Sequence, residues 1–293
     1  MDHSSRLHEL SERLAAIYKK NPKTDSVWIG GSVSRGWQDQ YSDIELYVCW
    51  KGEPNEEDRL QPVLMVQGEI IEFHDYEDGE WSETYFADET KMEISHFLTS
   101  AVSSALNDLT ASFSTSPDQQ CLASALFYGK PLEGHRTFHY LRNQVTHYPA
   151  ALKDAMILKN LELGNRWKNR GPLAAREDWL MLCQLMAATE NKLMSVLFAL
   201  NEMYIHHPAY KWQRNSLNEM NIKPYDAAGR MESVFLEHPA KGLILLEGLL
   251  EDVYKLVQKE CPHLNLQKIK KSNSLERYRA KGEETPNRFR SRS

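Results

Sequence analysis

A glycine-rich turn near the N-terminus has the composition of a phosphate-binding loop. Gly30, Gly31 and Ser32 follow a short apolar run, and Arg35 comes three residues after Ser32. Glycines at a strand-to-helix turn let the backbone approach a phosphate closely, because no side chain stands in the way. The N–H groups of the following helix and the Ser32 hydroxyl can donate to the anion, and Arg35 adds a fixed positive charge. We therefore expect Gly31, Ser32 and Arg35 to bind a nucleotide through its phosphates.

Two carboxylates, Asp43 and Glu45, follow this turn at a spacing of two residues. On a β-strand that spacing places both on one face, while Ile44 and Leu46 point into the core. Neighbouring carboxylates repel each other, and a divalent cation between them removes the conflict. Mg²⁺ is the natural ion, because it takes oxygen ligands and is commonly shared with NTP phosphates. The alternative is an ordinary turn followed by an edge strand with an acidic outer face.

In this order and spacing, the turn and the acid pair resemble the signature of the nucleotidyltransferase superfamily that includes DNA polymerase β. That signature is Gly-Ser followed, a short segment later, by acid-x-acid. The second acid is commonly Asp, whereas Glu45 stands here. The kanamycin nucleotidyltransferase type shares this departure, since its motif is similar to Gly-Ser-x-x-Arg followed by Ser-Asp-Ile-Glu. The resemblance implies that Asp43 and Glu45 are metal ligands in a polymerase-β-like domain that precedes a helical domain.

The superfamily requires a third acid on a neighbouring strand, which would complete a site for two Mg²⁺ ions. Glu72 lies between Ile71 and Phe73, so on a strand its carboxylate points away from both apolar neighbours. This segment resembles the Val-Glu-Val strand of the kanamycin type, which implies that Glu72 is the third ligand. His74 lies on the same face and is a weaker candidate. The alternative for Glu72 is a solvated strand face.

Transfer to a hydroxyl also needs a base, which is often a carboxylate. Glu162 and Arg166 are four residues apart, which places them on one face of a predicted helix. The run from Glu162 to Asn169 resembles the catalytic helix of the kanamycin type, although that type has Lys where Arg166 stands. The resemblance implies that Glu162 is the general base and Arg166 a nucleotide contact. A surface ion pair is the alternative, and Glu190 is a rival base because burial in an apolar helix would raise its pKa.

Apolar periodicity predicts a small sheet in the first part of the chain. Residues 4–20 have helical spacing, and 27–29 and 44–48 have the composition of strands. Residues 51–60 have the composition of a polar loop. Two further strands, 63–66 and 70–73, flank a predicted hairpin turn.

Long helical patterns follow at 149–168, 176–203 and 240–260, so the chain is predicted to be α+β. The expected parts are a nucleotidyltransferase domain with a small mixed sheet over 1–110, an α-helical bundle domain over 111–265, and a basic, disordered tail over 266–293.

Segment 204–212 is rich in rings and cations. Such side chains could line an acceptor pocket by stacking against sugars or bases, although packing between helices is their commoner use. The segment contains Tyr204, His206, His207, Tyr210, Lys211 and Trp212.

Composition and charge narrow the class of protein. The chain is 41% hydrophobic, enough for a substantial core, and carries a net charge of −6 with His neutral. The tail has nine Lys and Arg against three Glu, so the rest of the chain carries a net charge of about −12. This acidic charge argues against a nucleic-acid partner.

The sequence also predicts neither a membrane span nor a signal peptide. No apolar run is long enough for a membrane span, and Met1 to His8 lacks the core of a signal peptide. Four widely spaced cysteines predict free thiols and a cytoplasmic protein.

Together these features predict a cytoplasmic, metal-dependent nucleotidyltransferase. It would move an NMP, expected to be AMP from ATP, onto a hydroxyl of a small acceptor. The resemblance implies an aminoglycoside- or lincosamide-like acceptor, with antibiotic resistance as one role, and a homodimer. The acidic body suits a cationic acceptor. Two alternatives stay open: adenylylation of a protein or RNA acceptor, which the basic tail favours, and nucleotide binding without catalysis, against which the intact acid set argues.

Overall fold

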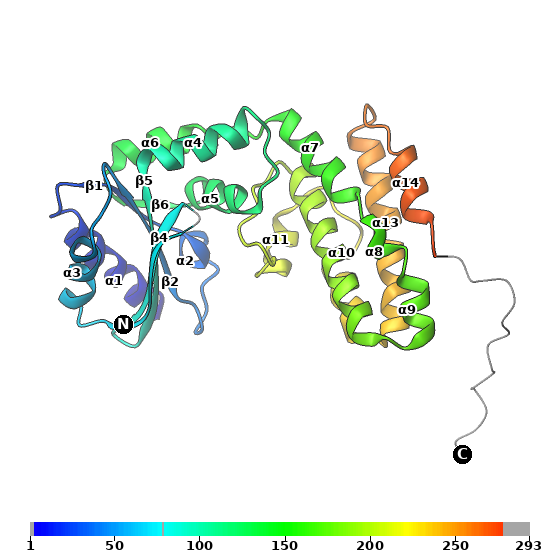
Figure 1. Ribbon diagram of the computed structural model, residues 1–293, viewed down its shortest axis with the longest axis horizontal. Helices are drawn as coiled ribbons and strands as arrows, with labels where there is room; N and C mark the ends of the chain where they lie inside the picture. Colours follow the sequence, from blue (N-terminus) through cyan, green and yellow to red (C-terminus); the bar gives the residue numbers. More distant parts are fainter. Residues whose placement is uncertain (1–2, 78, 278–293) are drawn as a thin grey trace, which may run out of the picture. The chain divides into compact units, whose positions relative to one another are not determined.

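The computed structural model describes residues 3–77 and 79–277, which form the α+β fold that the sequence predicts (Figure 1). These residues divide into two compact units. The first contains the sheet, extends to Asn160 and includes Met194–Lys223. The second contains Leu161–Leu193 and the described residues from Pro224 onward. These units are defined by contacts within the structure, whereas the boundaries expected at residues 110 and 265 separate domains that would fold independently. Those boundaries therefore stay predictions.

Within the described residues, every strand lies before residue 134, whereas helices occur along the whole chain. The strands are β1 (Thr24–Ile29), β2 (Ile44–Trp50), β3 (Glu69–Glu77), β4 (Glu80–Ala87), β5 (Thr90–Leu98) and β6 (Lys130–Glu133). The helices up to the first unit boundary are α1 (His3–Tyr18), α2 (Gly31–Arg35), α3 (Glu56–Met65), α4 (Thr99–Thr110), α5 (Pro117–Phe127), α6 (His135–Asn143) and α7 (Ala150–Leu161). The later helices are α8 (Gly164–Trp167), α9 (Arg170–Arg176), α10 (Trp179–Leu200), α11 (Gln213–Glu219), α12 (Ala227–Leu236), α13 (Pro239–Glu260) and α14 (Gln267–Ser274).

The six strands form one mixed sheet in the order β3-β4-β5-β2-β1-β6. β2 and β5 are parallel, and the other pairs are antiparallel. β2 therefore lies between β1 and β5, although the whole β3–β4 hairpin separates β2 from β5 along the chain. The two strands that flank the predicted acid pair are thus β1 and β5.

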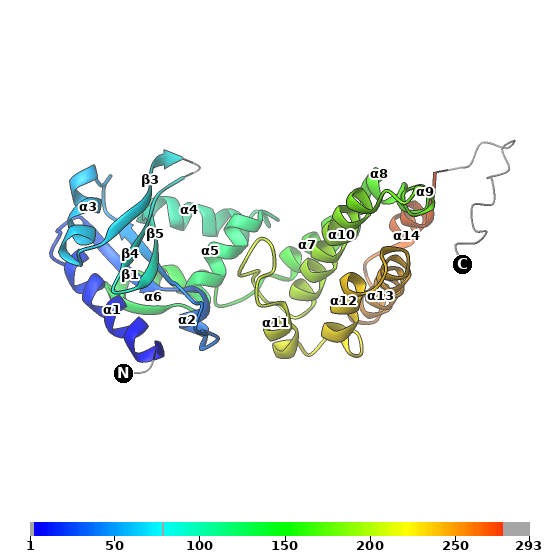
Figure 2. The same ribbon diagram turned by 90° about the horizontal axis from the view of Figure 1, so that it is seen from below.

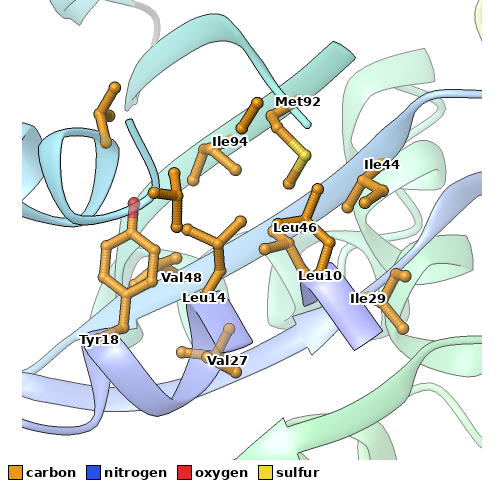
Figure 3. Close-up of a cluster of buried hydrophobic side chains, with 14 of the residues drawn as sticks. Leu10, Leu14, Tyr18, Val27, Ile29, Ile44, Leu46, Val48, Met92 and Ile94 are labelled. Carbon is orange, nitrogen blue, oxygen red and sulfur yellow. The ribbon is translucent and has the colours of Figure 1, made fainter. Parts of the chain in front are cut away.

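One face of the sheet is covered by α1 and α3, and this interface is the core of the first unit (Figure 3). Leu7, Leu10, Leu14 and Tyr18 recur at helical spacing along α1 and are buried. Alternate strand residues meet them: Val27 and Ile29 of β1; Ile44, Leu46 and Val48 of β2; Met92 and Ile94 of β5. Because side chains alternate across a strand, the intervening residues of β2 and β5 must point to the opposite face.

On that opposite face, the sheet is covered by α4, α5 and α6 (Figures 1 and 2). Three aromatic rings form a row across β1, β2 and β5. The Trp28 and Tyr47 rings stack with centroids 5.3 Å apart, and the Tyr47 and Phe97 rings stack at 6.4 Å. Trp28 also contacts Phe138 of α6 at 5.9 Å. This face carries the acids predicted to bind a metal.

Two local predictions were wrong between residues 51 and 69. The expected loop contains α3, which Asn55 caps by accepting from Asp58 N while the Asp58 side chain accepts from Asn55 N. Val63 lies inside α3, so the expected hairpin at 67–69 does not exist. The hairpin is instead formed by β3 and β4.

The second unit is helical and extends into the expected tail. Asn273 of α14 is buried, where its side-chain amide donates to Leu161 O at 2.7 Å and to the Tyr254 hydroxyl at 2.5 Å. The Trp167 indole donates to Asn273 O at 3.1 Å. Residues 267–277 are therefore packed structure and not the start of a disordered tail. The remainder of that prediction, 278–293, lies outside the described residues.

Within the described ranges, no helix is both long and apolar enough to cross a membrane. The four cysteines, Cys49, Cys121, Cys183 and Cys261, are all free thiols.

Candidate functional site

The turn between β1 and α2 lies directly against the acid-bearing strand. Gly30 N donates to Glu45 O at 3.0 Å, which continues the pairing of β1 with β2. Gly31 has φ +60°, and a Cβ there would collide with the Glu45 carboxylate, so this position requires glycine. Ser32 is buried beside it. Because α2 has only five residues, its dipole adds little, and anion binding at this turn would depend on backbone approach and on nearby cations.

Arg35 places a buried cation next to this turn. Its side chain is 4% exposed, and its guanidinium carbon lies 3.6 Å from the Tyr128 ring centroid and 4.7 Å from that of Trp37. Nη2 donates to Ser124 Oγ at 2.8 Å, whereas Nη1 is 3.9 Å from Glu219 and lacks a hydrogen-bond acceptor among the described residues. Burial lowers the pKa of Arg35, but a guanidinium remains charged at neutral pH. An incoming phosphate would satisfy this group.

A small cavity lies over the turn. Its free volume is about 30 Å³, room for roughly two water molecules, so a triphosphate could enter only if the covering residues moved. Segment 204–212, which the sequence left between pocket lining and helix packing, does line this cavity. The lining includes Gly31, Ser32, Arg35, Trp37 and Glu45 on one side, and Cys121, Ser124, His206, His207, Lys211 and Trp212 on the other.

The covering segment is held in a strained conformation. Tyr210 has φ +55° and Trp212 has φ +64°, a region that bulky residues adopt at a cost of about 1–3 kcal/mol. The His206 ring contacts Trp37 edge-on at 5.4 Å and its Nε2 lies 2.7 Å from Lys211 O. Burial and the nearby guanidinium lower the pKa of His206 to about 4, so it is neutral at physiological pH. Lys211 and the arginine are therefore the strong cations of this cavity.

The acids of the site lie on β2 and β5. Glu45 is directly opposite Glu93 in the parallel ladder, so both carboxylates are on the same face of the sheet. Asp43 immediately precedes β2 and is 15% exposed. Lys91 donates a hydrogen bond to Glu93, and its Nζ lies 3.8 Å from Asp43 Oδ2. The hydrogen bond to Glu93 and the charge of Asp43 raise the pKa of Lys91.

The donor set fits a divalent cation chemically. Burial, followed by the charges of Asp43 and Glu93, raises the pKa of Glu45 to about 7, so ionising this carboxyl in the folded chain costs free energy that a bound cation would offset. As they stand, the side chains do not converge on one point: over 3–77 and 79–277, no three His, Cys, Asp or Glu side chains are grouped as metal ligands would be. The Lys91 ammonium occupies the place of a cation between two of the acids, and a metal ion would have to displace it.

Glu72 is not brought together with the other predicted ligands. It lies on β3, three strands from β2, which corresponds to about 14 Å across a sheet. The register Glu72–Thr84–Glu93 puts it on the same face, but its side chain is 60% exposed and contacts His74 at 3.5 Å. Glu93 occupies the neighbouring strand on which the third acid was expected. It was not among the predicted ligands, although Met92-Glu93-Ile94 has the same apolar-acid-apolar pattern as the segment around Glu72.

Glu162 and Arg166 are not on one helix. α7 ends at Leu161, and Gly164 begins α8 with φ +78°, so Glu162 lies in the break between the two helices. Arg166 lines a groove of about 1110 Å³ within the second unit. Glu190 is buried in α10 and belongs to the same unit. The carboxylates on the sheet belong to the first unit, so the role of each of these three residues stays a prediction.

Comparison with known proteins gives a partial family match. The family described as "Domain of unknown function (DUF4037)" matches residues 115–213, which include α5 and the segment covering the cavity. No curated protein matches the sequence. Among solved structures, the chain is similar to a nucleotidyltransferase-like protein from Exiguobacterium sibiricum, with 14% identity over 88% of this chain and 80% of that one. The TM-score is 0.40, a likeness too weak to transfer either a fold or an activity.

Proposed function

We propose that this chain is a metal-dependent nucleotidyltransferase that moves an NMP from an NTP, with ATP as the expected donor, to a hydroxyl of a small acceptor. The observation that carries the proposal is the juxtaposition of a cluster of three acids with a cationic cavity. Asp43, Glu45 and Glu93 supply the acids, and Arg35 and Lys211 line the cavity that adjoins them. A divalent ion and a triphosphate together would neutralise both sets of charges.

The acidic residues would bind the metal ion, and the basic residues would bind the phosphates. Asp43, Glu45 and Glu93 would hold Mg²⁺, with Lys91 released to solvent or to a phosphate. When bound, Mg²⁺ supplies electrostatic stabilisation of the charge that develops on the α-phosphate and on the leaving pyrophosphate. Arg35, with one N–H edge lacking an acceptor in the described structure, would donate to phosphate oxygens.

The glycine turn would orient the triphosphate for in-line attack. The Glu45 carboxylate fills the space beside Gly31 that a side chain would occupy, so the metal ligand lies directly against the turn that would hold the phosphates. Ser32 would add a hydroxyl donor. The acceptor proton would pass to a carboxylate base, for which Glu162 remains the expected candidate and Glu190 its rival.

Labelled NTPs would test this function directly. The full chain would be incubated with each of the four NTPs, Mg²⁺, and a panel of aminoglycosides, lincosamides and small-molecule extract. The expected result is pyrophosphate release with an NMP mass increment on one acceptor class, abolished by EDTA and reduced about 100-fold or more in Asp43→Asn.

The matched control is Asp75→Asn, which removes an exposed acid on β3 and should retain activity. NTP binding without any transfer or hydrolysis, unchanged in Asp43→Asn, would rule out a catalytic role.

A further inference from the structure

The segment that covers the small cavity, residues 204–212, closes the proposed nucleotide site. The free volume beneath it is about 30 Å³, and the segment supplies His206, His207, Lys211 and Trp212 to the lining. A triphosphate has three phosphate groups and does not fit into this volume. The site is therefore shut by residues of the same unit.

Individual side chains attach this segment to the rest of the first unit. The Tyr210 hydroxyl is hydrogen-bonded to Ser195 Oγ of α10, and its ring lies 5.8 Å from that of Phe198 on the same helix. Ile205 N donates to the Gln120 side chain of α5 at 3.4 Å. The segment itself is turns and irregular backbone, so lifting it would break no ladder of a helix or sheet. Such attachments are typical of segments that open locally at low cost.

Both ends of the segment have left-handed backbone. Glu202 precedes it with φ +54°, and Tyr210 and Trp212 near its end have φ +55° and +64°. Residues with large side chains adopt this region at a cost in free energy. The closed conformation is therefore strained at the residues about which the segment would turn, and opening would relax them.

Closure also leaves two buried polar atoms without a hydrogen-bond partner in the described part of the chain. His206 Nε2 lies 2.7 Å from the Lys211 carbonyl and must donate to it, so Nδ1 remains as an acceptor that receives no hydrogen bond. Arg35 Nη1 is the second such atom, and it belongs to a side chain that is 4% exposed. Both atoms raise the free energy of the closed conformation, because water could reach them once the segment lifted.

A carboxylate that follows the covering segment stands beside Arg35. α11 continues directly from Trp212, and its last residue, Glu219, places Oε2 3.9 Å from Arg35 Nη1. This distance is too long for a hydrogen bond, so Glu219 offers a negative charge without satisfying the guanidinium. An incoming phosphate would take its place with a direct bond.

We propose that residues 204–219 form an autoinhibitory gate, which excludes NTP from the cavity until it lifts. The inference rests on the proposed nucleotide site at Arg35. Tyr210 holds the gate down through Ser195, and Glu219 holds it through Arg35. The left-handed residues and the unpaired polar atoms favour opening. The apparent affinity for NTP is then the affinity of the open form reduced by the fraction of molecules that are open.

Weakening the closed form should tighten NTP binding, whereas removing a residue that binds NTP would weaken it. Tyr210→Phe removes the hydrogen bond to Ser195 and keeps the ring, and Glu219→Gln removes the anion beside Arg35. Calorimetry on the full chain would measure the affinity for a non-hydrolysable ATP analogue with Mg²⁺. We expect each variant to bind the analogue about three- to tenfold more tightly than the unsubstituted protein.

Matched substitutions outside the gate control for the loss of a hydroxyl or a charge. Tyr140→Phe changes an exposed tyrosine of α6, and Glu12→Gln removes an exposed acid of α1. Both should bind the analogue with the affinity of the unsubstituted protein.

Hydrogen exchange of peptides from 204–219 reports the opening itself. Without nucleotide, these amides should exchange faster in Tyr210→Phe and Glu219→Gln than in the unsubstituted protein. The ATP analogue should speed their exchange in all three proteins, because the cavity cannot hold a triphosphate while the gate is down. A ligand that filled a preformed pocket would slow exchange instead.

The inference is overturned if Tyr210→Phe binds the analogue no more tightly than Tyr140→Phe does, or if the analogue slows exchange of 204–219. Failure of the proposed function is a different result: the gate variants would tighten binding of the analogue as expected, but neither transfer nor hydrolysis of NTP would depend on Asp43. Absence of analogue binding in all of these proteins would overturn both.

Discussion

At the scale of single residues, Glu45 links the chemistry of the site to the stability of the fold. Its carboxyl lies among Asp43, Glu93 and the glycine turn, and burial with these charges raises its pKa to about 7. An acid whose pKa is higher in the folded than in the unfolded chain destabilises the fold as pH rises, because the unfolded chain releases its proton first. The penalty begins near the ordinary pKa of Glu and is complete above pH 7.

Glu45→Gln should therefore stabilise the protein in EDTA at pH 8. We expect a gain on the order of 1–2 kcal/mol, less than the full shift would give because the side chain retains some contact with water. The gain should shrink at pH 5.5 and vanish near pH 4. Denaturant unfolding across this pH series measures it, with exposed Glu12→Gln of α1 as the control. A gain in stability that did not depend on pH would contradict this account. In the presence of Mg²⁺ and NTP, the unsubstituted protein should instead be more stable than Glu45→Gln.

Gly31 is the second residue on which the site depends. Gly31→Ala should cost about 2–4 kcal/mol, because it combines left-handed backbone strain with collision against the Glu45 carboxylate. Gly36→Ala is a close control, since Gly36 has φ +73° but open space around its Cα. It should cost about 1 kcal/mol, from strain alone. Thermal unfolding of both variants measures these losses of stability. Equal losses would mean that the contact between position 31 and Glu45 does not affect stability.

Individual site residues differed in how far the sequence could predict them. The turn and the pair Asp43–Glu45 depend on neighbours in the chain, and the structure places Glu45 directly against the turn. The third acid depends on which strand pairs with β2, and chain order does not determine that. Glu72 and Glu93 have similar local patterns, and the parallel pairing of β5 with β2 distinguishes them.

At the scale of elements, β5 is fixed by a fully buried polar network on the face opposite Glu93. His96 Nδ1 accepts from the Trp50 indole at 3.0 Å, so its Nε2 carries the proton and donates to Glu83 at 2.5 Å. Arg59 Nε donates to the same carboxylate at 3.0 Å, and Tyr18 donates at 3.3 Å. The network ties α1 and α3 to β4 and β5, and it holds the strand that carries Glu93.

Glu83→Gln should destabilise the protein by about 3–5 kcal/mol, because it leaves the Arg59 charge buried without its counterion. Glu89→Gln breaks an exposed pair with Arg6 and should cost at most about 0.5 kcal/mol. Denaturant unfolding of both variants gives the comparison. If Glu83→Gln lowered the free energy of unfolding no more than Glu89→Gln does, the polar network would not be what holds β5 in place.

Elements with a regular apolar period, such as α1 and α13, were predictable, and α3 was not. Gly52, Pro54 and the acids of 51–60 suggested a loop, but Asn55 and Asp58 form a capping box that begins the helix. β4 and β5 alternate apolar and polar residues but were not among the predicted strands. β4 and β5 pair with each other in a local hairpin, whereas the pairing of β5 with β2 is decided by contacts distant in sequence, which local patterns do not contain.

At the scale of the whole molecule, the second unit includes residues that the sequence assigned to a tail. Asn273→Ala should lower the free energy of unfolding by about 1–3 kcal/mol, since the Leu161 carbonyl and the Tyr254 hydroxyl would lose a buried donor. Ser274→Ala, on the exposed side of α14, should change it by less than about 0.5 kcal/mol. Denaturant unfolding compares the two, and equal stability would mean that α14 is not part of the folded unit.

The division into two units also explains what the sequence could not supply. The base predicted at Glu162 lies in one unit and the acids in the other, so its role depends on long-range geometry that helical spacing cannot encode. The acids and the cations of the proposed nucleotide site, in contrast, belong to a single unit. The central claim can therefore be tested on metal binding alone.

The most direct measurement is Mn²⁺ binding, followed by electron paramagnetic resonance in the presence of a non-hydrolysable ATP analogue. The variants are Glu93→Gln and Glu72→Gln, which remove acids from the same face of the sheet, one on the strand beside β2 and one three strands away. The account predicts that Glu93→Gln weakens Mn²⁺ binding at least about tenfold, while Glu72→Gln changes it less than twofold. Weakened binding in Glu72→Gln with unchanged binding in Glu93→Gln would contradict it.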